Sequence, residues 1–345
     1  MEANRAALAG PLSPHAGVYA GRITWANLTE VSPAPIGREK GAPSMPKASQ
    51  RLRRTAAIVV ATGMLLLGTA TAANAGTAKP SVTGPPVVQV VATTADGVTL
   101  PDRVHSGIVT FRFSQGDADF HAIQGFRLKP GGSLDSVMEG FSDALLGDFA
   151  TRVTGVALIN AGATLIGGSL IFPGASMDVT VSLTRGTYYF FDYNDVGVIT
   201  PRISTIQAVG DFRIAPLPSF NAVVVATMEN GLPRFITPTT MSATQTFFFF
   251  NGSDEDHEVM FRPAVAGTTD DYITTFYNAV LAGGPRPPSP WTDIQHGLQP
   301  VSPGLWAIVH IDLPPGLYAE ICYVPDDETG IPHAYEGMHV VINLN

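Results

Sequence analysis

The chain has 345 residues, which is enough for two domains of ordinary size. Hydrophobic residues make up 45% of it and charged residues 14%, and it contains 35 Gly and 28 Pro. This composition excludes a largely disordered chain and favours an all-β protein rich in turns. The formal net charge is −9, with a balance of +5 in residues 1–75 and −14 in the rest. Such an acidic body excludes nucleic acid as a partner.

Residues 45–75 have the pattern of a secretory signal peptide. Lys47 and three arginines up to Arg54 form a basic segment, and the apolar run that follows, 56–67, is too short for a transmembrane helix. Ala73-Asn74-Ala75 is a cleavage motif. We therefore expect cleavage after Ala75, a secreted, extracellular mature protein and no stable insertion into a membrane.

The segments on either side of this signal show no sign of a folded domain. Residues 1–44 are rich in Ala, Pro and Gly and lack periodicity. They are predicted to be either a disordered extension or the result of a misplaced start, with translation beginning at Met45. Residues 76–85 are predicted to be a linker.

The rest of the chain contains an internal duplication. Three blocks recur in the same order: Val90–Thr93 as Val224–Thr227, Thr110–His121 as Thr246–His257, and Leu183–Tyr188 as Leu313–Tyr318. The offsets between the paired blocks are 134, 136 and 130 residues. Two related units are therefore predicted, at 86–216 and 220–345, joined near Ala215–Ser219.

Each unit has the pattern of a β-protein with one short helical insertion. Strands are indicated by runs rich in β-formers or by alternation with period two, at 107–113, 177–183, 244–250 and 306–313. Apolar residues at helical spacing predict the insertions, at 134–145 behind Ser133 and at 273–281 behind Asp270. The predicted fold class is all-β, with two β-sandwiches in tandem.

The residues able to bind a metal lie in the second unit. Cys322 is the only cysteine, so it has no partner for an intramolecular disulfide. His333 and Met338 follow it in the chain, and His257 lies upstream, at the end of a repeated block. Two imidazoles, one thiolate and one thioether are the ligand set of a blue-copper electron-transfer site. The alternative for each residue is ordinary packing, since a free cysteine also packs like a small apolar side chain.

These residues give the second unit a resemblance to the cupredoxin family, which includes plastocyanins, azurins and the copper domains of nitrite reductases and multicopper oxidases. It is carried by Asn251 ahead of His257, by Pro315-Gly316-Leu317-Tyr318 leading to Cys322, and by the spacing of His333 and Met338. The resemblance implies a Greek-key β-sandwich and one type-1-like copper ion held by His257, Cys322, His333 and, weakly, Met338. It implies one-electron transfer or copper holding outside the membrane. It also implies a redox partner protein docking at an exposed apolar edge around His333.

Two departures from the family pattern limit these expectations. Ten residues separate Cys322 from His333, more than in small cupredoxins, and they include three acidic residues at 326–328. Ile321 precedes the thiol where nitrite reductases and multicopper oxidases place a histidine bound to a second copper centre, and the chain has no His-x-His pair. We therefore do not expect an enzyme with a type-2 or trinuclear copper site.

The first unit keeps the pattern without the ligands. His121 takes the place of His257, but Asp192 stands where Cys322 stands, and no His or Met follows before Phe212. Residues 86–216 are therefore predicted to be a degenerate cupredoxin-like domain without copper, with His121 packed in a loop or at the surface. Such ligand loss leaves open a second function for the chain, a metal-free secreted structural or interaction protein on the same scaffold.

Two further features are expected at the surface. The acidic run at 254–256 lacks the spacing of a calcium loop and predicts a solvated loop. His339 follows Met338 directly, so on a strand it would point to the opposite face.

Overall fold

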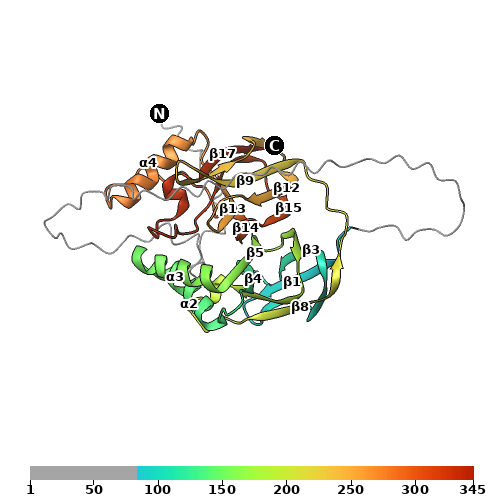
Figure 1. Ribbon diagram of the computed structural model, residues 1–345. Helices are drawn as coiled ribbons and strands as arrows, with labels where there is room; N and C mark the ends of the chain where they lie inside the picture. The colour runs from blue at the N-terminus through green and yellow to red at the C-terminus, as the bar shows by residue number, and fades with distance from the viewer. Residues whose placement is uncertain (1–83) are drawn as a thin grey trace, which may run out of the picture. The chain divides into compact units, whose positions relative to one another are not determined.

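The computed structural model describes residues 84–345, which are mostly β with three α-helices (Figure 1). The predictions for residues 1–44 and for the signal peptide at 45–75 lie outside this part, as does most of the linker at 76–85. None of the three helices within 84–345 is both long and apolar enough to cross a bilayer. We call residues 87–213 the first half and residues 222–345 the second half.

The two halves contain the following elements. The strands of the first half are β1 (Val87–Thr93), β2 (Gly97–Thr99), β3 (Arg103–Gln115), β4 (His121–Leu128), β5 (Ala163–Ile171), β6 (Ser176–Leu183), β7 (Gly186–Asp192) and β8 (Ser204–Arg213). Its helices are α2 (Leu134–Leu146) and α3 (Phe149–Gly162), with a 3-10 turn η1 (Tyr193–Asp195). The strands of the second half are β9 (Ala222–Glu229), β10 (Leu232–Ile236), β11 (Thr240–Met241), β12 (Thr244–Asn251), β13 (His257–Pro263), β14 (His296–Val301), β15 (Trp306–Asp312), β16 (Gly316–Ile321) and β17 (His339–Leu344). Its helix is α4 (Asp270–Leu281), with a 3-10 turn η2 (His333–Glu336).

Strand pairing follows the same scheme in both halves. In the first half β3 pairs in parallel with β1 and antiparallel with β6, β4 lies between β5 and β7, and β8 pairs with β7. In the second half β12 lies between β9 and β15, β13 lies between β14 and β16, and β17 pairs with β16. The duplication read from the sequence is therefore also a duplication of the pairing scheme.

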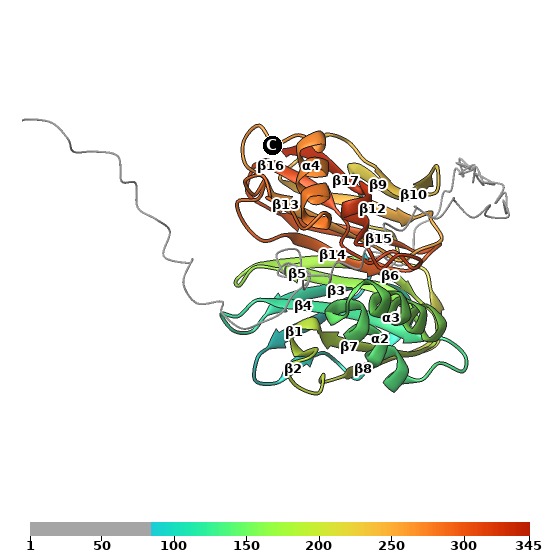
Figure 2. The same ribbon diagram turned by 90° about the vertical axis from the view of Figure 1, so that its left-hand side faces the viewer.

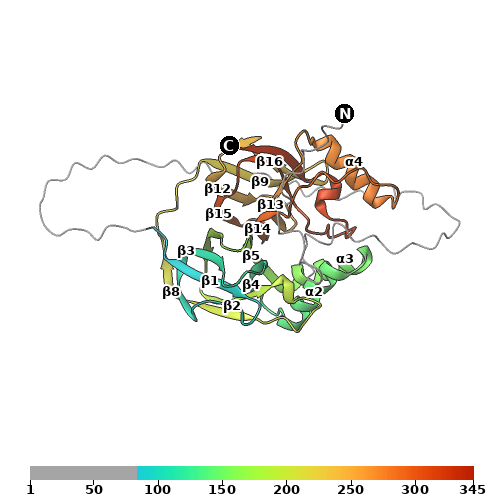
Figure 3. The same cartoon turned by 180° about the vertical axis from the view of Figure 1, so that it is seen from behind.

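Equivalent strands of the two halves also pair with each other. β5 pairs antiparallel with β14 (Figure 3). β6 pairs antiparallel with β15. Val179 lies directly opposite Val309, and the two are equivalent residues at the repeat offset of 130. The strand ladders thus continue from one half into the other, which the sequence repeat alone did not predict.

The apolar residues gather in two clusters. One lies among the strands of both halves and includes Phe111, Phe190, Phe247 and Phe261, all at most 1% exposed. The other lies beneath the helices and includes residues of α2, α3 and α4 together with strand residues such as Met260 and Ile321. Figure 2 shows the three helices toward the viewer, with the strands behind them. Each helix therefore buries one face against strands, which is the main source of its stability.

The helix predicted at 134–145 is confirmed as α2, but the first half contains a second helix, α3, that the sequence analysis missed. The apolar positions of α3 form only a weak stripe, and it contains Gly155 and Gly162. These residues allow close packing: a Cβ on Gly155 would lie 2.6 Å from the carbonyl oxygen of Gly140 in α2. The prediction of one helical insertion in each half was therefore wrong for the first half.

The helix predicted at 273–281 is confirmed as α4, with a different N-cap. Thr269 caps it, because its side chain accepts a hydrogen bond from the backbone N–H of Tyr272 at 3.2 Å. The carboxylate of Asp270 instead contacts β17, where it lies 3.1 Å from Nδ1 of His339. His339 is 7% exposed, so the expectation that it lies at the surface was wrong.

Candidate metal centre

His257 is the first residue of β13 and is fully buried. The loop that precedes it is held by Asn251, whose amide nitrogen donates to the carbonyl oxygens of Glu255 and Val301, each at 2.7 Å. The side-chain oxygen of Asn251 accepts from the backbone N–H of Ser253 at 3.1 Å. The polar residue ahead of the histidine therefore fixes the turn that positions the imidazole.

Cys322 directly follows β16, and the chain then returns to it twice. The backbone N–H of Ala334 donates to the carbonyl oxygen of Cys322 at 2.7 Å. The N–H of Cys322 donates to the carbonyl oxygen of Met338 at 3.3 Å. The N–H of Met338 donates to the carbonyl oxygen of His333 at 2.9 Å. These backbone bonds keep His333 and Met338 next to Cys322 whether or not a metal is bound.

The long segment between Cys322 and His333 closes on itself. Pro325 and Pro332 form an isolated β-bridge, and the carboxylate of Asp326 accepts from the N–H groups of Glu328 and Thr329 at 2.9 and 2.6 Å. The extra residues therefore form a separate loop. They do not move His333 away from the thiol.

These contacts bring three of the four predicted ligands together. The ligand atoms of His257, Cys322 and His333 all lie within 4.8 Å of one another, and all three residues are 0% exposed. The sulfur of Cys322 lies 3.5 Å from Nδ1 of His333 and 3.7 Å from Nδ1 of His257. Met338, also 0% exposed, joins this group through its backbone bonds to Cys322 and His333.

These distances fit a metal ion placed between the three atoms. With metal–nitrogen and metal–sulfur bonds of about 2.0 and 2.3 Å and a trigonal angle of about 120°, the sulfur and nitrogen atoms lie about 3.7 Å apart. Nε2 of His257 has no hydrogen-bond partner within residues 84–345, so packing and the contact of Nδ1 with the sulfur of Cys322 hold the ring. A soft sulfur with two imidazole nitrogens and a nearby thioether is the donor set of a type-1 copper site, and the buried His-Cys-His-Met group fits such a site.

Burial favours the neutral forms of Cys322 and His257. Burial raises the pKa of the Cys322 thiol well above its usual range. Burial, with His333 beside it, lowers the pKa of His257 well below its usual range. A metal ion would therefore meet a neutral imidazole, which can ligate at once, and a thiol, which must release its proton on binding.

Two buried carboxylates that the sequence analysis did not select support the group. Oε2 of Glu255 lies 2.7 Å from Nε2 of His333, so the ring has Nδ1 toward the sulfur and Nε2 toward this carboxylate. Glu258 accepts from the backbone N–H of Tyr323 at 2.8 Å, and burial raises its pKa to about 8. A carboxylate on the second nitrogen of a ligating histidine orients the ring and makes it a stronger donor.

Two expectations about exposure were wrong at this site. Asp254 is exposed, but Glu255 and Asp256 are 4% and 6% exposed, so most of the acidic run is buried and does not form a solvated loop. His333 is 0% exposed and its outer nitrogen contacts Glu255, so it does not present an exposed edge. The docking of a redox partner near His333 stays a prediction.

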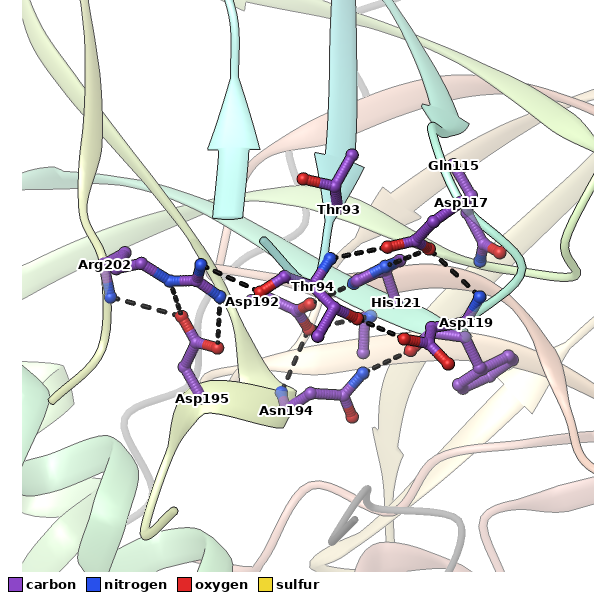
Figure 4. A network of polar contacts seen from close by, with 12 residues as sticks. Thr93, Thr94, Gln115, Asp117, Asp119, His121, Asp192, Asn194, Asp195 and Arg202 are labelled. Carbon is purple, nitrogen blue, oxygen red and sulfur yellow. Dashed lines mark hydrogen bonds and ion pairs between the residues drawn. The ribbon is translucent and has the colours of Figure 1, made fainter. Parts of the chain in front are cut away.

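The equivalent place in the first half holds ion pairs (Figure 4). His121 Nδ1 contacts the carboxylate of Asp192, and its Nε2 lies 3.0 Å from Asp117. Burial alone would lower the pKa of His121, but hydrogen bonds and charges from Asp192 and Asp117 outweigh it, so the pKa is raised. His121 is 1% exposed and is the first residue of β4, so it lies buried at the start of a strand, and the predicted position in a loop or at the surface was wrong.

The sequence matches no family model and no curated protein. Among solved structures, it is similar to the copper nitrite reductase from Nitrosomonas europaea, with 14% identity and a TM-score of 0.22 over 75% of this chain and 93% of the other. It is also similar to amicyanin from Paracoccus versutus, with 16% identity and a TM-score of 0.21 over 37% and 85% of the two chains. A multicopper oxidase matches at 12% identity and a TM-score of 0.22, over 75% and 88%. At such low values, the proposals that follow rest on the geometry of the site.

Proposed function

We propose that the protein binds one copper ion in a type-1-like site and serves in one-electron transfer or copper holding outside the membrane. His257, Cys322 and His333 would be the strong ligands and Met338 the weak one. The observation that carries the proposal is the sulfur of Cys322 facing Nδ1 of both histidines, at 3.7 and 3.5 Å, with all three residues fully buried. In this proposal 220–345 and 86–216 are two Greek-key β-sandwiches of the cupredoxin type, only the second with ligands.

The residues of this chain suit such a role in three ways. Bound copper supplies a one-electron couple between its two common oxidation states. The buried ligands exclude water from the site, and the backbone bonds between Cys322, His333 and Met338 hold the ligands in place. Because these bonds do not depend on the metal, little rearrangement should accompany a change of its charge.

The test is addition of Cu(II) to the purified mature chain. We expect an intense visible absorption from the bond between thiolate and metal, together with one equivalent of bound copper. Cys322→Ser should abolish the absorption. A wild-type chain that stays colourless would instead favour a metal-free structural or interaction protein. Colour alone leaves electron transfer and copper holding unresolved, and the rate of electron exchange separates them.

Glu255→Gln is expected to raise the reduction potential of the copper-loaded protein. The carboxylate on His333 is buried, so its negative charge is poorly screened and stabilises the more highly charged metal ion. Glutamine can still hydrogen-bond the ring but carries no charge. We expect a rise of about 60 mV, which corresponds to a tenfold change in a one-electron equilibrium.

Glu328→Gln is the matched control, because Glu328 is exposed and lies in the loop between Cys322 and His333. Solvent screens its charge, so the potential should hardly change. Equal shifts in the two variants, measured by redox titration of the visible band, would contradict a specific effect of Glu255.

A further inference from the structure

The exposed ligand edge expected at His333 is closed by two contacts. Its outer nitrogen lies 2.7 Å from buried Glu255. The loop before it is covered by α3 of the first half: a Cβ on Gly330 would lie 2.0 Å from the carbonyl oxygen of Phe149. The outer edge of this imidazole is therefore covered by other residues and does not reach the surface. An electron leaving the site needs another route.

A cluster of tyrosines begins at the residue after the thiolate. Tyr323 is bonded to Cys322 through the backbone and is 1% exposed. Its hydroxyl shares a hydrogen bond of 2.9 Å with that of Tyr277 on α4. The ring of Tyr277 stacks on Tyr335 of η2, with centroids 4.3 Å apart and planes 21° apart. Tyr335 is half-buried, so the cluster leads from Cys322 to the surface in three side chains.

The inner tyrosines are held rigidly and keep their protons. Arg262 donates from Nη1 to the hydroxyl of Tyr323 at 2.7 Å and lies over the ring of Trp291 at 4.8 Å. Burial raises the pKa of Tyr277 and Tyr323. Both phenols therefore stay neutral over the physiological range, and the hydrogen bond between them persists.

The outer end of the cluster lies in a positive environment. Burial raises the pKa of Tyr335, and the positive charges of Arg152, Arg262 and Arg286 oppose this rise. Arg152 comes from α3 of the first half, and Arg286 is exposed beyond α4. Positive charge at this point contrasts with the −14 balance of residues 76–345, so it marks a place where a negatively charged molecule can approach.

We infer that electrons enter and leave the proposed copper site through Tyr323, Tyr277 and Tyr335, and that the redox partner binds at Tyr335 through an acidic surface. The inference rests on the proposed copper site. One electron passes from the reduced site to a one-electron acceptor, which is reduced; no bond breaks and no proton moves. The first half contributes Arg152 to the docking surface and covers the ligand loop, which gives the half without ligands a role in the function.

The kinetic test uses the copper-loaded, reduced protein and hexacyanoferrate(III) as an anionic acceptor in stopped flow. Tyr335→Leu and Tyr277→Phe should each slow oxidation about tenfold, with unchanged absorption and potential. Tyr272→Leu is the matched control, because Tyr272 is also half-buried on α4 but contacts none of the three tyrosines through its ring, and it should react at the wild-type rate. Arg286→Glu should slow the reaction with hexacyanoferrate(III) but not with the cation hexaammineruthenium(III).

A second readout does not depend on copper. Redox-inert hexacyanochromate(III) should broaden the nuclear magnetic resonance signals of Tyr335 in the metal-free chain, and less so in Arg286→Glu. Wild-type rates in both tyrosine variants of a blue protein, or broadening confined to other surfaces, would overturn the relay while leaving the copper site intact. A wild-type chain that stays colourless with copper would overturn both.

Discussion

Copper in thousandfold excess over its dissociation constant is expected to raise the free energy of unfolding of the protein by about 4 kcal/mol. A ligand that binds the folded state and not the unfolded one stabilises by mass action. Here His257 begins β13, Cys322 follows β16, His333 begins η2 and Met338 lies between η2 and β17. Unfolding therefore separates ligands that are up to 81 residues apart in the chain, from His257 to Met338. Urea denaturation with and without Cu(II), followed by circular dichroism, measures the difference.

His257→Ala and Cys322→Ser are the controls for this stabilisation. Each should unfold at nearly the same urea concentration with and without copper, because each removes a strong ligand. His310→Ala tests for adventitious binding, since His310 is exposed on β15, where its Nδ1 lies 3.0 Å from the hydroxyl of Thr246. It should retain the full copper effect. If the urea midpoint of the wild type is the same with and without copper, this would favour a metal-free structural or interaction protein.

The sequence was a good guide where local pattern and chain order decide the outcome. The repeat located His257 at the end of a repeated block, and the structure places it at the start of β13. The segment from Pro315 to Tyr318 was expected to lead to Cys322, and the structure places the strand β16 there. The stripes of α2 and α4 were visible because Phe141 and Tyr277 repeat at helical spacing with other apolar residues. Each of these features depends on neighbours in the sequence.

Features that depend on distant contacts were not predictable from the sequence. An acidic run such as 254–256 usually points to solvent, but Glu255 is buried by His333, which lies 78 residues later. The loop that precedes His333 in turn lies against α3 of the other half, where Phe149 approaches Gly330. α3 itself was missed because its glycines, which allow contact with α2, weaken its apolar stripe.

Asp192→Asn is expected to destabilise the first half by about 3 kcal/mol, although no metal is involved. Asp192 contacts His121 Nδ1 and also accepts from the backbone N–H groups of Ala122 at 3.1 Å and Asn194 at 3.0 Å (Figure 4). Asp192 and His121 are 2% and 1% exposed. Asparagine can replace one of the two oxygens but not the charge, and breaking a buried ion pair on one side leaves the other charge uncompensated.

Asp178→Asn is the matched control, because Asp178 forms a pair of hydrogen bonds of 2.7 Å with Arg112 on neighbouring strands. Those side chains are 23% and 46% exposed. Solvent screens the interaction, so this variant should cost less than about 1 kcal/mol. The urea midpoints of the two variants measure the difference in their loss of stability. An equal loss of stability in both variants would contradict a stabilising role for the buried pair of Asp192 and His121.

The destabilisation by Asp192→Asn should depend on pH. The pKa of His121 is raised in the folded state, so the stability it contributes is present below the unfolded value of about 6.5 and is lost as the pH rises through the folded value. The difference in the free energy of unfolding between wild type and Asp192→Asn should therefore decrease on going from about pH 6 to about pH 9. The protonated imidazole between Asp117 and Asp192 then takes the place that a cation occupies in the proposed copper site. A gap that stays constant over this range would mean that His121 is neutral in the folded protein and that hydrogen bonding alone, without charge, holds the two carboxylates.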